Sequence, residues 1–149
     1  MRKEETIDYH IRAAWHAIAR MYNQQAAKYD ATMAIGFVLL NIDAEEGTPA
    51  TKIAPLMGLE PRSLTRILKT LEERGAIYRE VDKTDKRSVR IFLTDDGRKA
   101  REHSRQTVLQ FNEVLRKEIS EEKLNVFFDV IGQINRIIEQ NNIYDKTYS

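Results

Sequence analysis

The chain has 149 residues and a formal net charge of +1; 42% of its residues are hydrophobic, enough for one domain with a buried core. It contains no cysteine, which excludes disulfides, thiolate metal sites and cysteine-based redox switches. Without an apolar run of about 18 residues or a signal-peptide core, we expect a cytoplasmic protein with no membrane partner.

Two helices are expected at the N-terminus. Residues 6–29 place apolar side chains, beginning with Ile7 and Ile11, three or four positions apart, which predicts an amphipathic helix. Thr32 is a suitable cap for a second helix over residues 33–42. Nearly all side chains of this second segment are apolar, so we expect it to be enclosed on most sides.

A helix, a tight turn and another helix are predicted between residues 48 and 75. Thr48 and Pro49 have the properties of a cap and first turn for the shorter helix, and Gly58 falls where the two helices would meet. Pro61 and Gly75 mark the start and end of the second helix. Its apolar face consists of Leu64, Ile67, Leu68 and Leu71. This arrangement is typical of motifs that lay a second helix in a DNA major groove.

A β-hairpin is expected immediately afterwards. Residues 77–81 and 89–93 alternate between apolar and polar side chains, which is typical of half-buried strands. The loop between them is polar and carries three cations. A cationic hairpin tip of this kind can reach a neighbouring minor groove.

Two further helices complete the chain. Thr94 can cap a long helix over residues 95–117, and Ser120 can start the last one. Apolar side chains of the last helix cover more than one stripe, which favours packing against a partner as well as against the chain's own core. The alternative is burial within the monomer.

The central part of the chain resembles the winged helix-turn-helix core of the MarR family of bacterial transcriptional regulators. The resemblance is carried by Leu64-Thr65-Arg66, Arg74-Gly75, Asp85 with Arg87, and Leu93-Thr94-Asp95-Asp96-Gly97. Members of that family often have a doubled aspartate-x-arginine in the wing, and here Thr84 occupies the first arginine position. Only Asp85 and Arg87 are therefore carried over.

The resemblance implies a mainly α fold with a small antiparallel β wing, formed by a winged helix-turn-helix flanked by N- and C-terminal dimerisation helices. We expect a single domain over residues 1–149. Residues 32–97 would form the winged helix-turn-helix, residues 95–117 the linking helix, and residues 1–31 and 118–149 the dimerisation helices.

The positive charge lies where such a motif needs it. Residues 51–90 contain ten Lys or Arg and six Asp or Glu, or +4, against 14 and 17, or −3, elsewhere. The N-terminal half of the second helix would read base edges through Arg62, Ser63 and Arg66. Phosphate contacts are expected from Thr65, Lys69, Thr51, Lys52, Lys83 and Lys86.

In the wing, we expect Arg87 to enter the minor groove with its guanidinium oriented by Asp85, the roles that these two positions play in the resembling family. Without DNA, the pair would be an ordinary loop salt bridge, and the helix cations an ordinary solvated face. Glu72 and Glu73 would repel phosphate and must face away from it.

A homodimer and an effector site are also expected. The candidate dimerisation residues are Ile7, Ile11, Trp15, Leu124, Phe127, Phe128, Ile131, Ile134, Ile138 and Tyr144, with Ile143 and Tyr148 in the tail. The resemblance implies release by a small aromatic or phenolic ligand, for which the candidate lining is Tyr9, Trp15, His16, Met33, Phe37 and Phe111. These aromatic positions could equally be plain core.

The sequence shows no metal, cofactor or catalytic motif. The three histidines lack the spacing of a metal set, and no glycine-rich phosphate loop or nucleophile elbow is present. We therefore predict a dimeric, ligand-responsive repressor that reads a pseudo-palindromic duplex. A winged-helix module that binds another protein is the alternative; double-stranded RNA fits less well because its major groove excludes a helix.

Overall fold

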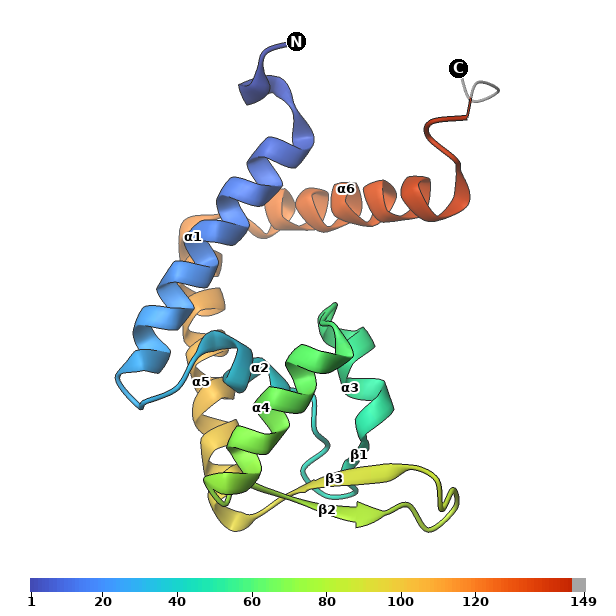
Figure 1. Ribbon diagram of the computed structural model, residues 1–149. Coiled ribbons are helices and arrows are strands. Elements are labelled where there is room, and N and C mark those ends of the chain that lie inside the picture. Colours follow the sequence, from blue (N-terminus) through green and yellow to red (C-terminus); the bar gives the residue numbers. More distant parts are fainter. Residues whose placement is uncertain (146–149) are drawn as a thin grey trace. The chain divides into compact units, whose positions relative to one another are not determined.

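The computed structural model describes residues 1–145 and divides into two compact units, Met1–Gln106 and Thr107–Ser149. In chain order, the elements are η1 (Lys3–Glu5), α1 (Ile7–Ala27), α2 (Met33–Leu40), β1 (Thr48–Pro49), α3 (Ala50–Met57), α4 (Pro61–Glu73), β2 (Ile77–Val81), β3 (Val89–Leu93), α5 (Asp95–Glu118) and α6 (Glu121–Gln140) (Figure 1). Among the described residues, no helix is both long and apolar enough to cross a membrane.

The helix boundaries follow the local signals in the sequence. Thr32 Oγ1 accepts a hydrogen bond from the Ile35 backbone N–H at 3.2 Å, and Thr94 Oγ1 accepts one from Gly97 at 3.0 Å. Gly75, just past the end of α4, has φ +75°, a backbone conformation that other residues adopt only at a cost. The predicted caps of α2 and α5 and the predicted end of α4 are thus confirmed.

The sheet has three strands, in the order β1-β3-β2, all antiparallel. Both predicted strands of the hairpin are present over the predicted residues, with Ile77 opposite Leu93. The prediction that Thr48 and Pro49 open a helix is wrong. They form β1 opposite Ile91 and Arg90, and α3 begins at Ala50.

The core of the first unit lies between the helices and the sheet. Its fully buried side chains include Val38 of α2, Ile53 of α3 and Ile91 of β3. The apolar face predicted for α4 is confirmed, because Leu64, Leu68 and Leu71 are buried and Ile67 packs against the same cluster. The prediction that alternate side chains of the hairpin strands are buried is confirmed for β3. It is wrong for most of β2, where only Ile77 is buried.

The second unit consists of the C-terminal part of α5 and all of α6. Ser120 Oγ caps α6 by accepting a hydrogen bond from the Lys123 N–H at 3.2 Å, as predicted. No residue of α6 is buried, and Phe127 and Phe128 pack ring to ring at 5.7 Å. Helix α6 therefore carries a large exposed apolar surface within this unit.

Candidate nucleic-acid interface

Helix α4 presents its predicted contact residues on the side opposite its buried leucines. Arg62, Arg66 and Lys69 are exposed, and so is Thr65, whose hydroxyl donates to the Pro61 carbonyl at 2.9 Å. Ser63 is half-buried. Because the leucines fix the rotation of α4 on the core, the cations have to point outward.

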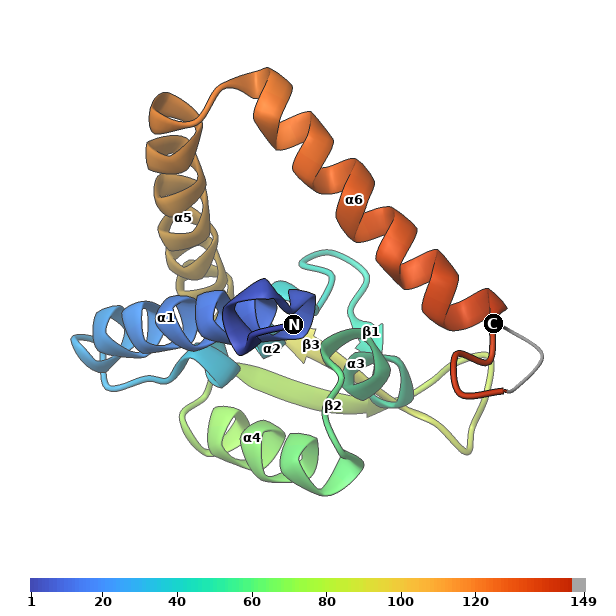
Figure 2. The ribbon, with the colours of Figure 1, turned by 90° about the horizontal axis from the view of Figure 1, so that it is seen from above.

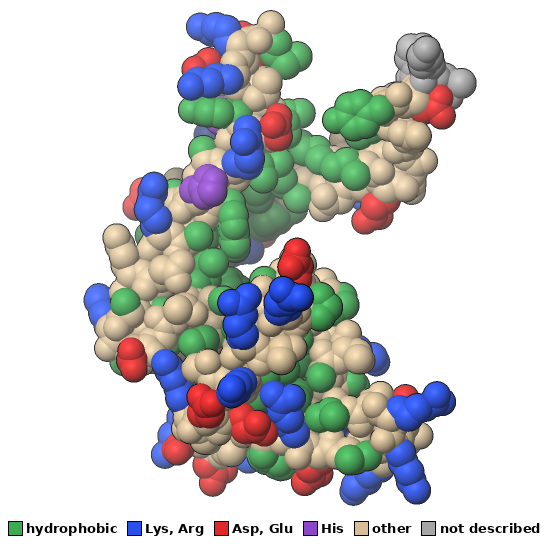
Figure 3. Space-filling view, viewed as in Figure 1, with side chains coloured by type: hydrophobic (Ala, Val, Ile, Leu, Met, Phe, Trp, Pro, Cys, Tyr) green, Lys and Arg blue, Asp and Glu red, His purple; other side chains and the backbone are tan. Residues whose placement is uncertain are grey.

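Cations lie over α4 and at the hairpin tip on this face of the first unit. The space-filling view shows Lys and Arg side chains over α4 and at the tip of the β2–β3 hairpin (Figure 3). That tip projects past α3 in both ribbon views (Figures 1 and 2). Thr51 and Lys52 are exposed in the first turn of α3. All the predicted DNA-contact residues except Ser63 are thus exposed to solvent.

Glu72 forms an ion pair with the hairpin. Its carboxylate lies 3.4 Å from Nε of Arg79 on β2. This contact joins the last turn of α4 to the hairpin and neutralises a charge that would otherwise repel a phosphate.

Within the wing, Asp85 shapes the backbone. Its carboxylate accepts hydrogen bonds from the Arg87 backbone N–H at 3.0 Å and from the Ser88 hydroxyl at 3.1 Å. Across the described part of the chain, no ion pair joins Asp85 to the Arg87 guanidinium. The expected orientation of that guanidinium by Asp85 is therefore replaced by control of the turn in which Arg87 sits.

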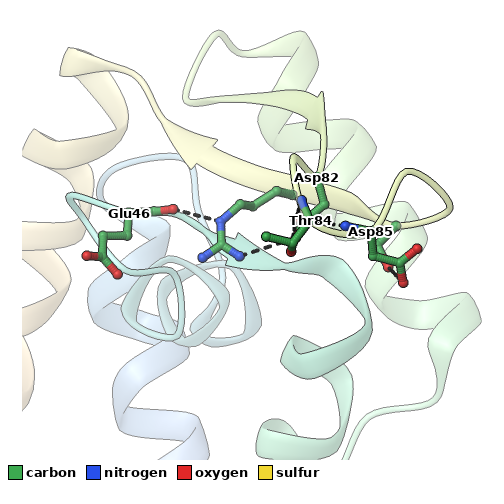
Figure 4. A network of polar contacts seen from close by, with 6 residues as sticks. Glu46, Asp82, Thr84 and Asp85 are labelled. Atoms are coloured by element: carbon green, nitrogen blue, oxygen red, sulfur yellow. Dashed lines mark hydrogen bonds and ion pairs between the residues drawn. The ribbon is translucent and has the colours of Figure 1, made fainter.

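A second carboxylate, Asp82, organises the start of the wing (Figure 4). It accepts hydrogen bonds from Thr84 N–H at 2.9 Å and Thr84 Oγ1 at 2.8 Å. These bonds are the main reason that the pKa of Asp82 lies below its ordinary value. Asp82 is buried, and Nη1 of Arg90 lies 3.4 Å from its other carboxylate oxygen.

The polar contacts of Asp82 were not predicted from the sequence. An aspartate followed two residues later by threonine is a recognisable signal for a side-chain-capped turn, and Asp82 and Thr84 have that spacing. Nothing in the sequence indicates that Arg90 would reach Asp82 and the Glu46 carbonyl.

The model for the MarR family matches residues 32–89, which include α2, the helix-turn-helix and most of the hairpin. Residues 32–89 of this chain are therefore similar to the MarR family. The family prediction is thereby confirmed, and with it the fold of helices around a small antiparallel wing.

One relative of this chain is the HTH-type transcriptional regulator TtmR of Methylorubrum extorquens strain PA1. The two are 40% identical over 88 residues, which are 59% of this chain and 45% of TtmR. The chain thus spans less than half the length of that relative. TtmR is described as a transcriptional regulator, not as an enzyme.

Solved structures share the fold across nearly the whole chain. A Staphylococcus aureus MepR–DNA complex has a TM-score of 0.80 and 24% identity, and covers 89% of this chain and 98% of its own. The repressor CouR bound to a 23-mer DNA duplex has a TM-score of 0.77 and 25% identity, and covers 89% and 94%. A structure of CouR from Rhodococcus jostii RHA1 contains p-coumaroyl-CoA.

The other candidate sites are found in both units. Ile7, Ile11 and Trp15 are exposed on α1, and Phe127, Phe128, Ile138 and Tyr144 are exposed in the second unit. Leu124, Ile131 and Ile134 are half-buried, Ile143 is exposed, and Tyr148 lies outside the described residues. The dimerisation set therefore stays a prediction.

The candidate effector-site residues are divided between the two units. Tyr9, Trp15, His16, Met33 and Phe37 belong to the first unit, and Phe111 belongs to the second. Phe37 packs edge-to-face on Tyr22, with ring centroids 5.9 Å apart. The effector lining therefore stays a prediction. Among residues 1–145, no group of three His, Asp or Glu side chains could hold a metal ion.

Proposed function

We propose that this chain acts in the cytoplasm as a homodimeric transcriptional regulator that reads a pseudo-palindromic DNA duplex. The observation that carries the proposal is the pairing of exposed cations on α4 with exposed cations at the wing tip, seen on one face of the molecule (Figure 3). CouR, which is similar to this chain, has been solved bound to a DNA duplex.

In this proposal, the N-terminal half of α4 enters the major groove. Arg62, Ser63 and Arg66 lie in its first two turns and are the candidates for base edges, where an arginine pairs best with guanine O6 and N7. Phosphate contacts from Thr65, Lys69, Thr51 and Lys52 fix the position of the helix.

The wing supplies the second contact. Arg87 is exposed, and Asp85 holds its backbone in the turn, so the guanidinium is presented at the hairpin tip. A narrow minor groove concentrates negative potential and attracts such a side chain. Lys83 and Lys86, also exposed in the loop, add sequence-independent attraction to phosphate.

A two-fold dimer would place two such readers about one DNA turn, roughly 34–36 Å, apart. The exposed apolar side chains of α1 and α6 would form its interface. We propose that an aromatic or phenolic molecule relieves repression. The support is that CouR, a repressor similar to this chain, has been solved with p-coumaroyl-CoA.

Selection of bound duplexes from a random library tests this function. One consensus with two-fold symmetry is expected, with affinity that falls steeply between 50 and 200 mM salt, as expected when several phosphates are contacted. Failure to bind any duplex at low salt, together with salt-insensitive binding to a protein, would support a protein-interaction module instead.

A further inference from the structure

Three arginines hold the loop that connects α2 to β1. Nε of Arg90 donates to the Glu46 carbonyl at 2.8 Å, Nε of Arg98 to Ala44 at 3.1 Å, and Nε of Arg101 to Ile42 at 3.1 Å. Every second carbonyl of the segment 42–46 therefore accepts a hydrogen bond from a charged donor.

Arg90 differs from the other two because it also reaches the wing. It lies on β3 opposite Glu80 and Pro49, and its Nη1 is 3.4 Å from Oδ2 of Asp82. Its side chain is 30% exposed and that of Asp82 11%. A partly buried charge pair of this kind is screened by salt less than a pair on the open surface.

From Asp82 the contacts continue towards the tip (Figure 4). The other carboxylate oxygen of Asp82 accepts hydrogen bonds from both Thr84 groups and, at 3.4 Å, from the Asp85 N–H. Asp85 in turn accepts a hydrogen bond from the Arg87 N–H at 3.0 Å. An unbroken series of polar contacts thus joins the Glu46 carbonyl to the backbone of Arg87.

We propose that Arg90 is a positioning residue for the wing: it fixes the hairpin tip on the body of the first unit so that Arg87 is held ready for DNA. This inference rests on the proposed function. Arg90 acts through Asp82: its Nε donates to the Glu46 carbonyl and its Nη1 to the Asp82 carboxylate, so both contacts lie within the protein. Among residues 1–145, the contacts that hold the seven-residue segment 82–88 are its own turn contacts and this link.

The first test needs no DNA. Hydrogen exchange of the wing amides is measured in the full chain and in Arg90→Gln, with Arg98→Gln as the matched control that breaks a bond to the same loop but leaves the wing untouched. Faster exchange at Thr84 and Asp85 is expected in Arg90→Gln alone, with α4 unchanged. Equal exchange in all three proteins would overturn the inference.

The second test is a double-mutant cycle on a duplex obtained by selection. Arg90→Gln should weaken binding about tenfold in the native chain and less than about twofold in an Arg87→Ala background, because both changes remove one contact. Independent, multiplicative losses would overturn the inference, as they would mean that Arg90 acts apart from Arg87.

A lysine variant separates position from charge. Arg90→Lys keeps the charge but cannot donate in two fixed directions, so it should behave like Arg90→Gln in both tests. Full binding by Arg90→Lys would mean that charge alone suffices and would overturn the inference. If the native chain binds no duplex, the proposed function fails, while the exchange measurement still decides whether Arg90 orders the wing.

Discussion

The carbonyl oxygen of Ala76 lies 1.9 Å from the position that a Cβ would occupy on Gly97. Gly97 is buried in the first turn of α5, and the Ala76 carbonyl also accepts a hydrogen bond from Thr94 N–H at 3.0 Å. The start of α5 is thus packed directly on the backbone that enters β2. This contact gives a physical reason for the glycine that closes the Leu-Thr-x-x-Gly motif.

Gly97→Ala should destabilise the fold by about 2–4 kcal/mol, because the clashing atoms belong to backbone that is fixed by neighbouring structure. Urea unfolding followed by circular dichroism measures this. Gly132→Ala is the matched control: it lies inside α6, its nearest neighbour is the flexible end of Arg136 at 3.4 Å, and a gain of about 0.5–1 kcal/mol is expected. A Gly97→Ala variant as stable as the native chain would contradict the described packing.

Arg87→Ala should weaken operator binding by about 1–3 kcal/mol, with little change in folding stability, because its guanidinium is exposed. A mobility-shift titration measures the affinity. Lys28→Ala removes an exposed cation at the end of α1 and should bind like the native chain. Full-strength binding by Arg87→Ala would remove the wing from the proposed interface.

Arg66 and Lys69 should make different kinds of DNA contact, Arg66 with a base edge and Lys69 with a phosphate. Arg66→Ala is expected to relax the sequence preference at one base pair and to cost about 1–3 kcal/mol. Lys69→Ala should weaken binding equally on all sequences. It should also reduce, by about 1, the steepness with which the logarithm of the binding constant falls with the logarithm of the salt concentration. Titrations of the selected duplex and single-base variants at several salt concentrations distinguish the two effects, and a uniform loss for Arg66→Ala would place it on phosphate.

Acidification should destabilise the wing. Because hydrogen bonds from Thr84 hold the pKa of Asp82 below 3.8 in the folded protein, its ionisation stabilises the fold above about pH 4. That contribution disappears as the pH falls through the lower folded value.

The stability difference between the native chain and Asp82→Asn, measured by urea unfolding, should be constant from pH 7 to pH 5 and shrink below pH 4. Comparison with this variant is needed because the pKa of Asp43 is also lowered, by hydrogen bonds from the Glu46 and Glu45 N–H groups. A difference that does not change with pH would refute the role given to the Asp82 carboxylate.

Phe127→Glu should convert the dimer into a monomer in sedimentation velocity. The ring is 55% exposed on α6, and a charge there cannot be buried against a partner without a large penalty. Gln133→Glu introduces the same charge at an exposed position of α6 and should remain dimeric. An unchanged mass for Phe127→Glu would exclude this part of α6 from the interface.

The elements with strong local signals were predictable. Helix α4 has a strict apolar spacing and both boundary residues, so its bounds agree with the structure. Strand β1 was not predictable because two residues show no periodicity, and Pro49 is as suitable for a helix start as for a strand. Burial in β2 was overestimated because alternation does not reveal that a hairpin extends beyond its core.

For the site, the exposed cations of α4 could be assigned from the helical period alone. The contact of Arg90 with the Glu46 carbonyl joins residues 44 positions apart in sequence and depends on the pairing of β1 with β3. No local pattern encodes such a relationship, and Arg90 has the appearance of an ordinary solvent-facing strand residue.

The separation of charge has a kinetic consequence. With +4 on residues 51–90 and −3 on the remainder, a distant duplex encounters a molecule that is almost neutral. Attraction begins only within about a Debye length, roughly 8–10 Å, and only when the α4 and wing side approaches first. In the proposed function, capture of a duplex is therefore late and selective for orientation.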